Sequence, residues 1–314
     1  MKKILTVTLN PAVDNTYTTQ TVIAGHVNRM RTAVKIAGGK GVNVAKILSQ
    51  YGCEVAATGF LGGYSGSFIA GELQKRGIQC SFIETAGETR SNMNIVADDG
   101  YVTEILEPGP EITEAEKDRF MEQFTVLLEE CGLVILSGSV AKGLKPDIYA
   151  DLIRLAVQKG VAVYLDSSGE SLRLGIQAKP DLIKPNIKEL EYIMGHKLKD
   201  REDVIEAARF LHEQGIARVI VSMGKKGLIS VSKKGTFWAK AERIRAVNTV
   251  GCGDSVVASY AMSAIDGETE ENAIRRACAV SAANATTIES ANIPMETADV
   301  LLPKIAVEKV PDGK

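Results

Sequence analysis

The chain has 314 residues, of which 45% are hydrophobic, and a formal net charge of −2, which is enough sequence for a large buried core. Its lysines and arginines are scattered and no apolar run approaches the ~20 residues that span a bilayer, so the composition excludes a basic nucleic-acid surface and a membrane span. The five cysteines form no Cys-x-x-Cys motif, so we expect no disulfides, no zinc site and a reduced, cytoplasmic location.

Two segments in the first third of the chain predict a small second sheet. Residues 12–36 and 79–107 lack helical periodicity and are rich in Thr, Val, Ile and Asn, which favours strands. We expect them to form a small antiparallel β-sheet that serves as a lid over a ligand cleft and as a homodimer surface. The remaining residues form the predicted core domain: 1–11, 37–78 and 108–314.

Strand-like apolar runs alternate with helical patterns through the core domain. The predicted strands are 133–138, 161–168, 182–186 and 218–224, and the predicted helices are 113–130, 146–159, 187–194 and 202–214. This alternation predicts an α/β fold with a Rossmann-like, mostly parallel sheet flanked by helices. Because ligands bind beyond the carboxyl ends of such strands, we expect functional residues directly after them.

The stretch AGGKGVNVAKIL, residues 37–48, places three glycines around Lys40 at the start of a helical pattern. One interpretation is a tight turn with an exposed lysine, and the other is a turn that binds a phosphate or sugar at a helix N-terminus. The spacing fits neither the G-x-x-x-x-G-K-[ST] phosphate loop nor the G-x-G-x-x-G dinucleotide motif.

Arg29 and Arg90 both lie in the predicted small sheet. Arginine is a natural bidentate ligand for phosphate, although a single arginine is more often a surface charge. The KPN stretch at 184–186 is followed by Glu189; this pattern fits a helix capping box, or a carboxylate that holds Mg²⁺ together with Asp166. SMGKKG, residues 222–227, fits either a β-hairpin or a loop around nucleotide phosphates.

The stretch TVGCGDS, residues 249–255, places Asp254 behind two glycines at the start of an apolar helical run. One interpretation is a helix N-cap, for which Asp is a favoured residue. The other is an anion site, because bare glycine N–H groups and a helix N-terminus attract negative charge. A carboxylate repels an anion, so in this second interpretation Asp254 accepts a proton from the attacking nucleophile.

Together these motifs resemble the PfkB (ribokinase-like) carbohydrate kinases along the whole chain. The two family signatures are matched by GGKGVNVA (38–45) and TVGCGDS (249–255), and KPN-x-x-E supports them. The 1-phosphofructokinase and tagatose-6-phosphate kinase branch is similar at TLNPAVD (8–14), GHVNR (25–29), GFLGG (59–63), GETR (87–90) and TEILEPGPEI (103–112). The resemblance implies a ribokinase-like fold with a β lid, and ATP and Mg²⁺ as cofactors.

The resemblance also implies a role for each matching residue. Catalysis is implied for Asp254 as base and for the anion hole formed by Gly251, Cys252 and Gly253. Substrate contacts are implied for Asp14, Arg29, Gly38, Gly39, Lys40, Asn43, Arg90 and Ser139. Nucleotide contacts are implied for Lys184, Asn186, Ser222, Gly224, Gly227 and Asn284. The candidates for magnesium remain Glu189 and Asp166.

The implied activity is ATP-dependent phosphorylation of a ketohexose monophosphate, with fructose 1-phosphate as the expected acceptor and fructose 1,6-bisphosphate as the product. Tagatose 6-phosphate and fructose 6-phosphate are the alternatives, because Asn94 stands where many 1-phosphofructokinases have lysine. Cys252 replaces the usual alanine, and as a small apolar residue it is expected to preserve packing. A non-catalytic sugar-phosphate sensor and a dinucleotide-dependent oxidoreductase are the alternatives from other classes.

Overall fold

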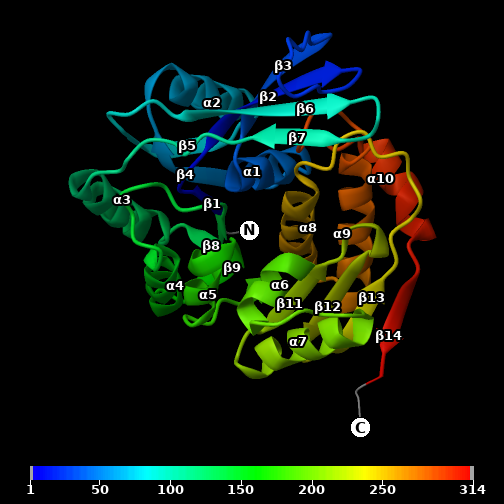
Figure 1. Cartoon of the computed structure of the whole chain (residues 1–314). Coiled ribbons are helices and arrows are strands. Elements are labelled where there is room, and N and C mark those ends of the chain that lie inside the picture. The colour runs from blue at the N-terminus through cyan, green and yellow to red at the C-terminus, as the bar shows by residue number, and fades with distance from the viewer. Residues whose placement is uncertain (1–2, 312–314) are drawn as a thin grey trace.

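The computed structural model describes residues 3–311, which form a large sheet with helices on both faces and a separate small sheet (Figure 1). The chain enters the small sheet directly from the carboxyl end of the first strand of the large sheet. The small sheet therefore begins at the edge where ligands bind in folds of this kind. No helix within the described range is long and apolar enough to cross a membrane.

Ten strands of the described chain form the large sheet, in the order β14-β13-β12-β11-β10-β9-β8-β1-β4-β5. The strands from β11 to β5 pair in parallel, and the strands from β11 to β14 pair antiparallel. Their bounds are β1 Lys3–Thr8, β4 Val55–Leu61, β5 Gln79–Glu84, β8 Cys131–Ser137, β9 Ala162–Asp166, β10 Leu182–Ile183, β11 Arg218–Ser222, β12 Leu228–Ser232, β13 Gly235–Ala239 and β14 Val307–Val310.

The helices cover both faces of this sheet, and an apolar core lies under each layer. One layer contains α1 Lys40–Gln50, α2 Gly63–Lys75, α8 Cys252–Asp266, α9 Glu270–Asn284 and α10 Met295–Leu301. The other contains α3 Glu114–Leu127, α4 Ile148–Gln158, α5 Gly169–Ile176, α6 Ile187–Met194 and α7 Arg201–Glu213. Two short 3-10 helices, η1 Gly224–Lys226 and η2 Leu302–Lys304, complete the described elements.

The predicted α/β class and the strand–helix alternation are confirmed. The four predicted helices correspond to α3, α4, α6 and α7, and the four predicted strands to β8, β9, β10 and β11. Local signals explain why the helix starts were recognisable, since α3 begins at a capping box formed by Thr113 and Glu116. Helix α5 was not predicted, because it has only eight residues, of which two are glycines.

Four strands of the described chain form the small sheet, in the order β3-β2-β6-β7. Their bounds are β2 Ala12–Thr19, β3 Thr32–Gly38, β6 Arg90–Ala97 and β7 Val102–Ile105. The expectation of an antiparallel sheet is wrong for the central pair, because β2 and β6 run parallel while the outer pairs are antiparallel. Both central strands follow a parallel strand of the large sheet, β1 or β5, so both leave it in the same direction.

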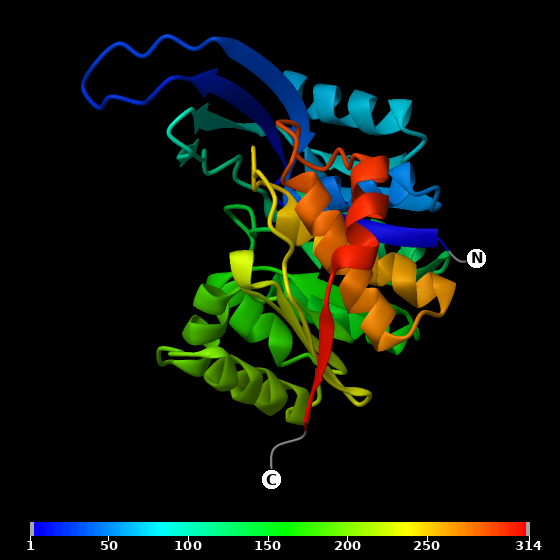
Figure 2. The same ribbon diagram turned by 90° about the vertical axis from the view of Figure 1, so that its right-hand side faces the viewer.

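The predicted bounds of the small sheet also need correction. Residues 79–84 form β5, which pairs with β4 at the edge of the large sheet, and β3 continues two residues past position 36. As an edge strand, β5 is only partly covered, so its sequence resembles that of a strand in the small sheet. The loop between β2 and β3 projects away from the body of the molecule (Figure 2).

Candidate active site

Two helix N-termini meet at the carboxyl edge of the large sheet. Helix α1 begins at Lys40, directly after β3, and α8 begins at Cys252; the two helices pack against each other. Asn43 Nδ2 donates a 2.8 Å hydrogen bond to Asp254 Oδ2, which joins residues 211 positions apart in the sequence. The two glycine-rich signatures therefore form one site.

Asp254 is the buried carboxyl at the start of α8, with 4% of its surface exposed. The N-cap of α8 is Gly251, with a φ of 84°, and no side chain caps the helix, so the N-cap interpretation of Asp254 is wrong. Burial raises the pKa of Asp254 to about 6; Lys40 opposes the shift and Asp166 reinforces it. A carboxyl with this pKa is mostly ionised at neutral pH and can accept a proton.

Asp166 ends β9 and is fully buried beside two ammonium groups. Its Oδ1 lies 3.1 Å from Lys40 Nζ and 3.3 Å from Lys184 Nζ. Burial alone would raise the pKa of Asp166, but Lys184 and Lys40 outweigh burial and hold that pKa below its usual value. Lys40 still exposes 37% of its side chain, so part of this residue lies at the surface of the site.

Lys184 also lies against the first turn of α8. A Cβ atom placed on Gly253 would be 3.1 Å from Lys184 Nζ, so the missing side chain lets the ammonium group approach the helix start. The free N–H groups of a first helical turn carry partial positive charge. Lys40, Lys184 and the N-terminus of α8 therefore provide a concentrated positive field for an anion.

Asp14 and Asn92 form a buried pair on the small sheet. Asn92 Nδ2, on β6, donates a 2.9 Å hydrogen bond to Asp14 Oδ1, on β2. Asp14 Oδ2 lies so close to Gly38 that any side chain at that glycine would collide with it. Burial raises the pKa of Asp14, against the hydrogen bond from Asn92 and the charges of Lys46 and Arg90. Asn92 Oδ1 is buried and lacks a hydrogen-bond partner among residues 3–311, which leaves an acceptor for a ligand hydroxyl.

Arg90 begins β6 and is anchored by backbone carbonyl groups. Its Nη2 and Nη1 each donate a 3.0 Å hydrogen bond, to Asn10 O and Glu107 O respectively. Asn10 Nδ2 in turn donates to Ser139 Oγ at 3.4 Å and to Pro108 O at 3.2 Å. Arg90 Nε and Asn10 Oδ1 are buried without partners in the described part of the chain. Arg90 is therefore a held, half-buried cation with a free donor, and not a solvated surface charge.

Asn284, at the end of α9, supports the loop before α8. Its Nδ2 donates to Val250 O at 2.8 Å, and its Oδ1 accepts from Ala291 N at 2.9 Å. Both ends of the amide are used inside the protein, so Asn284 shapes the loop, and its expected nucleotide contact stays a prediction. Cys252 Sγ lies 3.5 Å from Asn284 Nδ2, and burial raises the pKa of the thiol, which keeps it protonated at neutral pH.

The residues expected on the nucleotide side follow β10 and β11. Asn186 and Glu189 form the capping box of α6, with reciprocal hydrogen bonds of 2.8 and 2.9 Å, so the capping interpretation is confirmed. Ser222 ends β11 and forms a bridge with Asn186. Gly224 begins η1, and Gly227 has a φ of 94° and no room for a side chain against β13. The hairpin interpretation of 222–232 is therefore confirmed.

The carboxylates offer a partial metal site. No group of three or more His, Cys, Asp or Glu side chains within residues 3–311 could enclose a metal ion. Asp166 Oδ2 is buried and has no hydrogen-bond partner there, and the capping box of Glu189 uses its Oε2. Such a donor set suits Mg²⁺ that is held mainly by phosphate oxygens and water, with a carboxylate completing the shell.

Arg29 is the predicted site residue that lies apart from the others. It is exposed in the loop beyond the Thr18–Thr32 pair, whereas Asp14 and Gly38 lie toward the opposite end of the same two strands. One cavity of about 390 Å³, lined by Ile4 and other residues at the amino ends of β1 and β4, also contains none of the predicted residues.

Asn10 is the site residue that the sequence analysis missed. It follows β1 at the carboxyl edge of the sheet, where ligand-binding groups collect in folds of this kind. That position is the signal that would have identified it. Asn92 was not predicted either, because its contact with Asp14 depends on the pairing of β2 with β6.

Comparisons with known proteins agree with this geometry. The sequence profile of pfkB family carbohydrate kinases matches residues 5–298. A tagatose-6-phosphate kinase of Staphylococcus epidermidis is 37% identical over 310 residues, which cover 98% of this chain and 100% of that protein. The structure of a possible 1-phosphofructokinase from Thermotoga maritima has a TM-score of 0.91 and 28% identity, with 98% of this chain and 100% of that one covered. Phosphofructokinase-2 from Escherichia coli, in complex with substrates and products, has a TM-score of 0.89 and 25% identity, with 96% and 99% covered.

The fold has a ribokinase-like α/β architecture, and the family match with the named relatives makes the chain a phosphotransferase. The chain belongs to the pfkB family of carbohydrate kinases, and its relatives are named as sugar-phosphate kinases. The resemblance found in the sequence is thereby confirmed, and the alternative of a dinucleotide-dependent oxidoreductase is excluded.

Proposed function

We propose that the chain transfers the γ-phosphoryl group of Mg-ATP to a primary hydroxyl of a ketohexose monophosphate, with tagatose 6-phosphate as the acceptor. The observation that carries the proposal is the Asp254 carboxyl at the N-terminus of α8. It is buried, its pKa is about 6, and it lies in a site with two lysine ammonium groups. A general base and an anion site side by side are what phosphoryl transfer to an alcohol needs.

The proton passes from the acceptor hydroxyl to Asp254. Asn43 Nδ2 holds Oδ2 of the carboxylate, which leaves Oδ1 to face the substrate. As the hydroxyl oxygen bonds to the γ-phosphorus, the bond from that phosphorus to the β–γ bridging oxygen breaks. ADP leaves with the bonding electron pair, and Asp254 keeps the proton until solvent removes it.

The charge of the transferred group is stabilised by the positive field of the site. The N–H groups of residues 251–253 and the dipole of α8 act at the phosphoryl oxygens, and Lys40 and Lys184 add two full charges. Asp166 fixes both ammonium groups through one oxygen atom, so they need no reorganisation during transfer. The hairpin residues Ser222 and Gly224 lie at the same sheet edge and are proposed to contact the nucleotide.

Magnesium, when bound with ATP, neutralises phosphate charge and orients the terminal phosphoryl group. Asp166 Oδ2 and the Glu189 carboxylate are the groups of this chain proposed to hold it. Asp166 already binds the ammonium groups of Lys40 and Lys184, and Glu189 already caps α6. A contact with magnesium, direct or through water, would be an additional role for each carboxylate.

Arg90 is proposed to select an acceptor that already has a phosphate group. Its free Nε and its anchored guanidinium group suit a phosphate oxygen, with Asn10 and Ser139 beside it. Asp14 and Asn92 then face the sugar hydroxyls. Because these residues span both sheets, closure of the small sheet over the acceptor would exclude the water that hydrolyses ATP.

The choice of acceptor rests on the relatives. Tagatose 6-phosphate and fructose 1-phosphate each have a primary hydroxyl at the end of the sugar's carbon chain opposite to the phosphate. Both therefore suit a site with Arg90 at the phosphate and Asp254 at the hydroxyl. The relatives named tagatose-6-phosphate kinase are 37% identical, which favours tagatose 6-phosphate and the product tagatose 1,6-bisphosphate. Fructose 1-phosphate, expected from the sequence, is the second candidate, because the Thermotoga neighbour is named a possible 1-phosphofructokinase.

The test is ADP release with Mg-ATP, coupled to NADH oxidation, over a panel of acceptors compared by kcat/KM. The panel contains tagatose 6-phosphate, fructose 1-phosphate, fructose 6-phosphate, fructose and ribose. We expect the largest kcat/KM for tagatose 6-phosphate and little turnover of the unphosphorylated sugars. A larger kcat/KM for fructose 1-phosphate would make that sugar phosphate the acceptor in place of tagatose 6-phosphate. No turnover of any acceptor, together with ATP binding in calorimetry, would support the non-catalytic sensor.

The small sheet is also proposed to bind a second copy of this chain. Half of the exposed large apolar side chains in the described range lie on this sheet and its loops: Val22, Ile23, Val27, Val34, Met93, Tyr101, Ile105 and Leu106. Such a concentration is typical of a protein interface. Light scattering should give a dimer mass that falls to the monomer mass in a Val27→Asp, Tyr101→Asp variant. A monomeric wild type would contradict this part of the proposal.

A further inference from the structure

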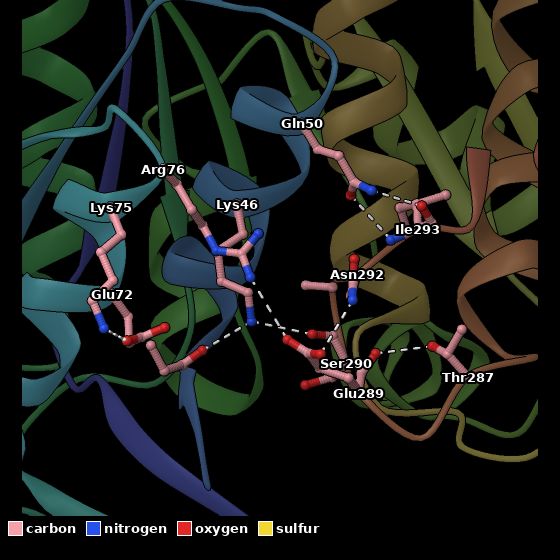
Figure 3. A network of polar contacts seen from close by, with 12 residues as sticks. Lys46, Gln50, Glu72, Lys75, Arg76, Thr287, Glu289, Ser290, Asn292 and Ile293 are labelled. Atoms are coloured by element: carbon pink, nitrogen blue, oxygen red, sulfur yellow. Dashed lines mark hydrogen bonds and ion pairs between the residues drawn. The ribbon is translucent and has the colours of Figure 1, made fainter. Parts of the chain in front are cut away.

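Lys46 is a buried cation that the phosphoryl-transfer steps do not use. It lies on α1, one turn after Asn43, and only 2% of its surface is exposed. Its Nζ donates to Ala37 O at 3.0 Å and to Ser290 O at 3.1 Å (Figure 3). A buried ammonium group is costly to place, and both of its hydrogen-bonded partners are neutral carbonyl groups.

One of these contacts leads to the acceptor side of the site. Ala37 lies near the end of β3, directly before Gly38, and Gly38 is the glycine against which Asp14 Oδ2 rests. The position of the Ala37 peptide therefore influences where Asp14 and the N-terminus of α1 lie. Lys46 holds this peptide through a buried hydrogen bond from its Nζ to Ala37 O.

The other contact leads to the anion loop. Ser290 precedes Ala291, whose N–H donates to Asn284 Oδ1, and Asn284 Nδ2 donates to Val250 O, directly before Gly251. Ala291 has a φ of 56°, an unusual conformation for a residue other than glycine, which persists only where the surroundings impose it. A Cβ atom on Gly251 would lie 3.2 Å from Ala291 N, so the two loops are also in direct contact.

We propose that Lys46 is a positioning residue for the phosphoryl-transfer reaction, whose ammonium group holds the β3 end and the anion loop in fixed relation to each other. The proposal rests on the proposed function and extends it to a residue outside the contact surface of the substrates. Through Ala37 it acts on the acceptor side, and through Ser290 and Asn284 on the loop that receives the phosphoryl group.

The charge of Lys46 interacts with two carboxylates of the candidate site, Asp14 and Asp254. Four charged groups face it: Arg76, after α2, lowers its pKa, and Glu289, Asp14 and Asp254 raise it. Burial has the largest effect, and the pKa of Lys46 falls from 10.5 to about 8. The ammonium form is therefore present below pH 8 and is lost as the pH rises through that value, which removes its charge and one donor hydrogen.

Gln50 provides a matched control on the same helix. One turn after Lys46, its side chain exchanges two hydrogen bonds with the backbone of Ile293, at 2.7 and 3.0 Å (Figure 3). Gln50 thus ties α1 to the same α9–α10 connection, and within residues 3–311 both of its side-chain hydrogen bonds go to Ile293 and none goes to β3. A Gln50→Met variant loosens the connection without cutting the link between β3 and the anion loop.

The experiment compares Lys46→Met, Lys46→Arg and Gln50→Met by kcat and KM on the preferred acceptor and by Tm. We expect Lys46→Met to lose at least about tenfold in kcat, because misplacement by an ångström costs up to about 10²-fold. Gln50→Met should lose less than about twofold at a similar loss of Tm, and Lys46→Arg should recover much of kcat. If Lys46→Met and Gln50→Met lose kcat in the same proportion to their loss of Tm, the proposal is overturned.

The pH profile tests the same idea in the wild type, which avoids any failure of a variant to fold. The wild-type kcat should fall above about pH 8, and Lys46→Arg, whose guanidinium stays charged, should move this limb to higher pH. A basic limb that stays at the same pH in Lys46→Arg as in the wild type would overturn the assignment of that limb to Lys46.

Hydrogen exchange separates this proposal from the proposed function. Amides of residues 36–39 and 286–291 should both exchange faster in Lys46→Met, while Gln50→Met should affect only the second segment. Protection that changes in one segment alone in Lys46→Met would overturn the link, whatever the substrate. Absence of turnover in the wild type would instead count against the proposed function.

Discussion

Asp254 and Asp166 are both buried at the same edge of the large sheet, yet their pKa values move in opposite directions. Asp254 accepts a hydrogen bond from one neutral amide, and its pKa rises to about 6. Asp166 lies beside two lysine ammonium groups, and its pKa falls. Equal burial therefore gives different chemistry, because the nearest partner decides whether the charged form is compensated.

The comparison assigns different tasks to two identical side chains. Asp254 can take up a proton in the range where enzymes work, which suits a base. Asp166 stays charged and fixes Lys40 and Lys184, which suits an electrostatic anchor. The four substitutions below test whether the two carboxyls, and the residues around them, differ as this assignment requires.

The largest effect is expected for Asp254→Asn. The amide cannot accept the proton, so kcat should fall by roughly 10²-fold or more, while KM for the sugar phosphate stays within a fewfold. Steady-state ADP release with unchanged circular dichroism and Tm is the measurement. A loss of only a few-fold in kcat would remove Asp254 from the role of base.

Asp166→Asn should act on stability and on the binding of Mg-ATP instead. The change leaves Lys184 buried without its counter-charge, which typically costs about 3–5 kcal/mol when one partner of a buried pair is removed. Urea unfolding should show this loss, and KM should rise for Mg-ATP. If Asp166→Asn unfolds like the wild type and loses only kcat, the two carboxyls share one role.

Arg90→Ala tests the acceptor end of the site. Loss of a charge-assisted hydrogen bond should raise KM for the sugar phosphate by roughly 10- to 100-fold, with little change in KM for ATP. Arg90→Lys keeps the charge but loses the planar donor set, so it should recover only part of the affinity. An unchanged KM for the sugar phosphate in Arg90→Ala would show that the phosphate binds elsewhere.

Cys252→Ala is expected to have the smallest effect. The thiol is protonated at neutral pH because burial raises its pKa, and its hydrogen bonds in the described part of the chain involve Ser281 O and Asn284 Nδ2. The change should alter kcat by less than about twofold, and brief treatment of the wild type with iodoacetamide should leave activity intact. Rapid inactivation that Cys252→Ala abolishes would reveal a reactive thiolate in the anion loop.

The sequence was sufficient for the fold class and for the pairing of the two glycine signatures. The order of strands and helices and the glycines before Lys40 and Asp254 are local features, so they are visible in the chain itself. The small sheet was predicted with errors, because the direction of β2 against β6 and the place of β5 depend on pairings between distant segments.

The sequence could not separate the two roles of buried carboxyls. An Asp near a helix start fits a cap and a base equally well, and only the fold shows that Gly251 occupies the cap position. Lys46 lies within the ordinary helical pattern VNVAKIL, and its burial follows from the packing of residues 286–291 against α1. Arg29 matched a motif, yet the β2–β3 loop holds it away from the site.

The most direct test of the account is the acid limb of kcat in the wild type and in Asp254→Asn. Asp254 must be ionised to take the proton, and its pKa is raised to about 6, so kcat should be constant between about pH 7 and pH 8 and fall about tenfold per unit below pH 6. The residual activity of Asp254→Asn, measured at saturating concentrations of the same substrates, should show no such limb. A wild-type kcat that stays constant down to about pH 4.5, near the ordinary pKa of an aspartate, would contradict the assignment of Asp254 as the base.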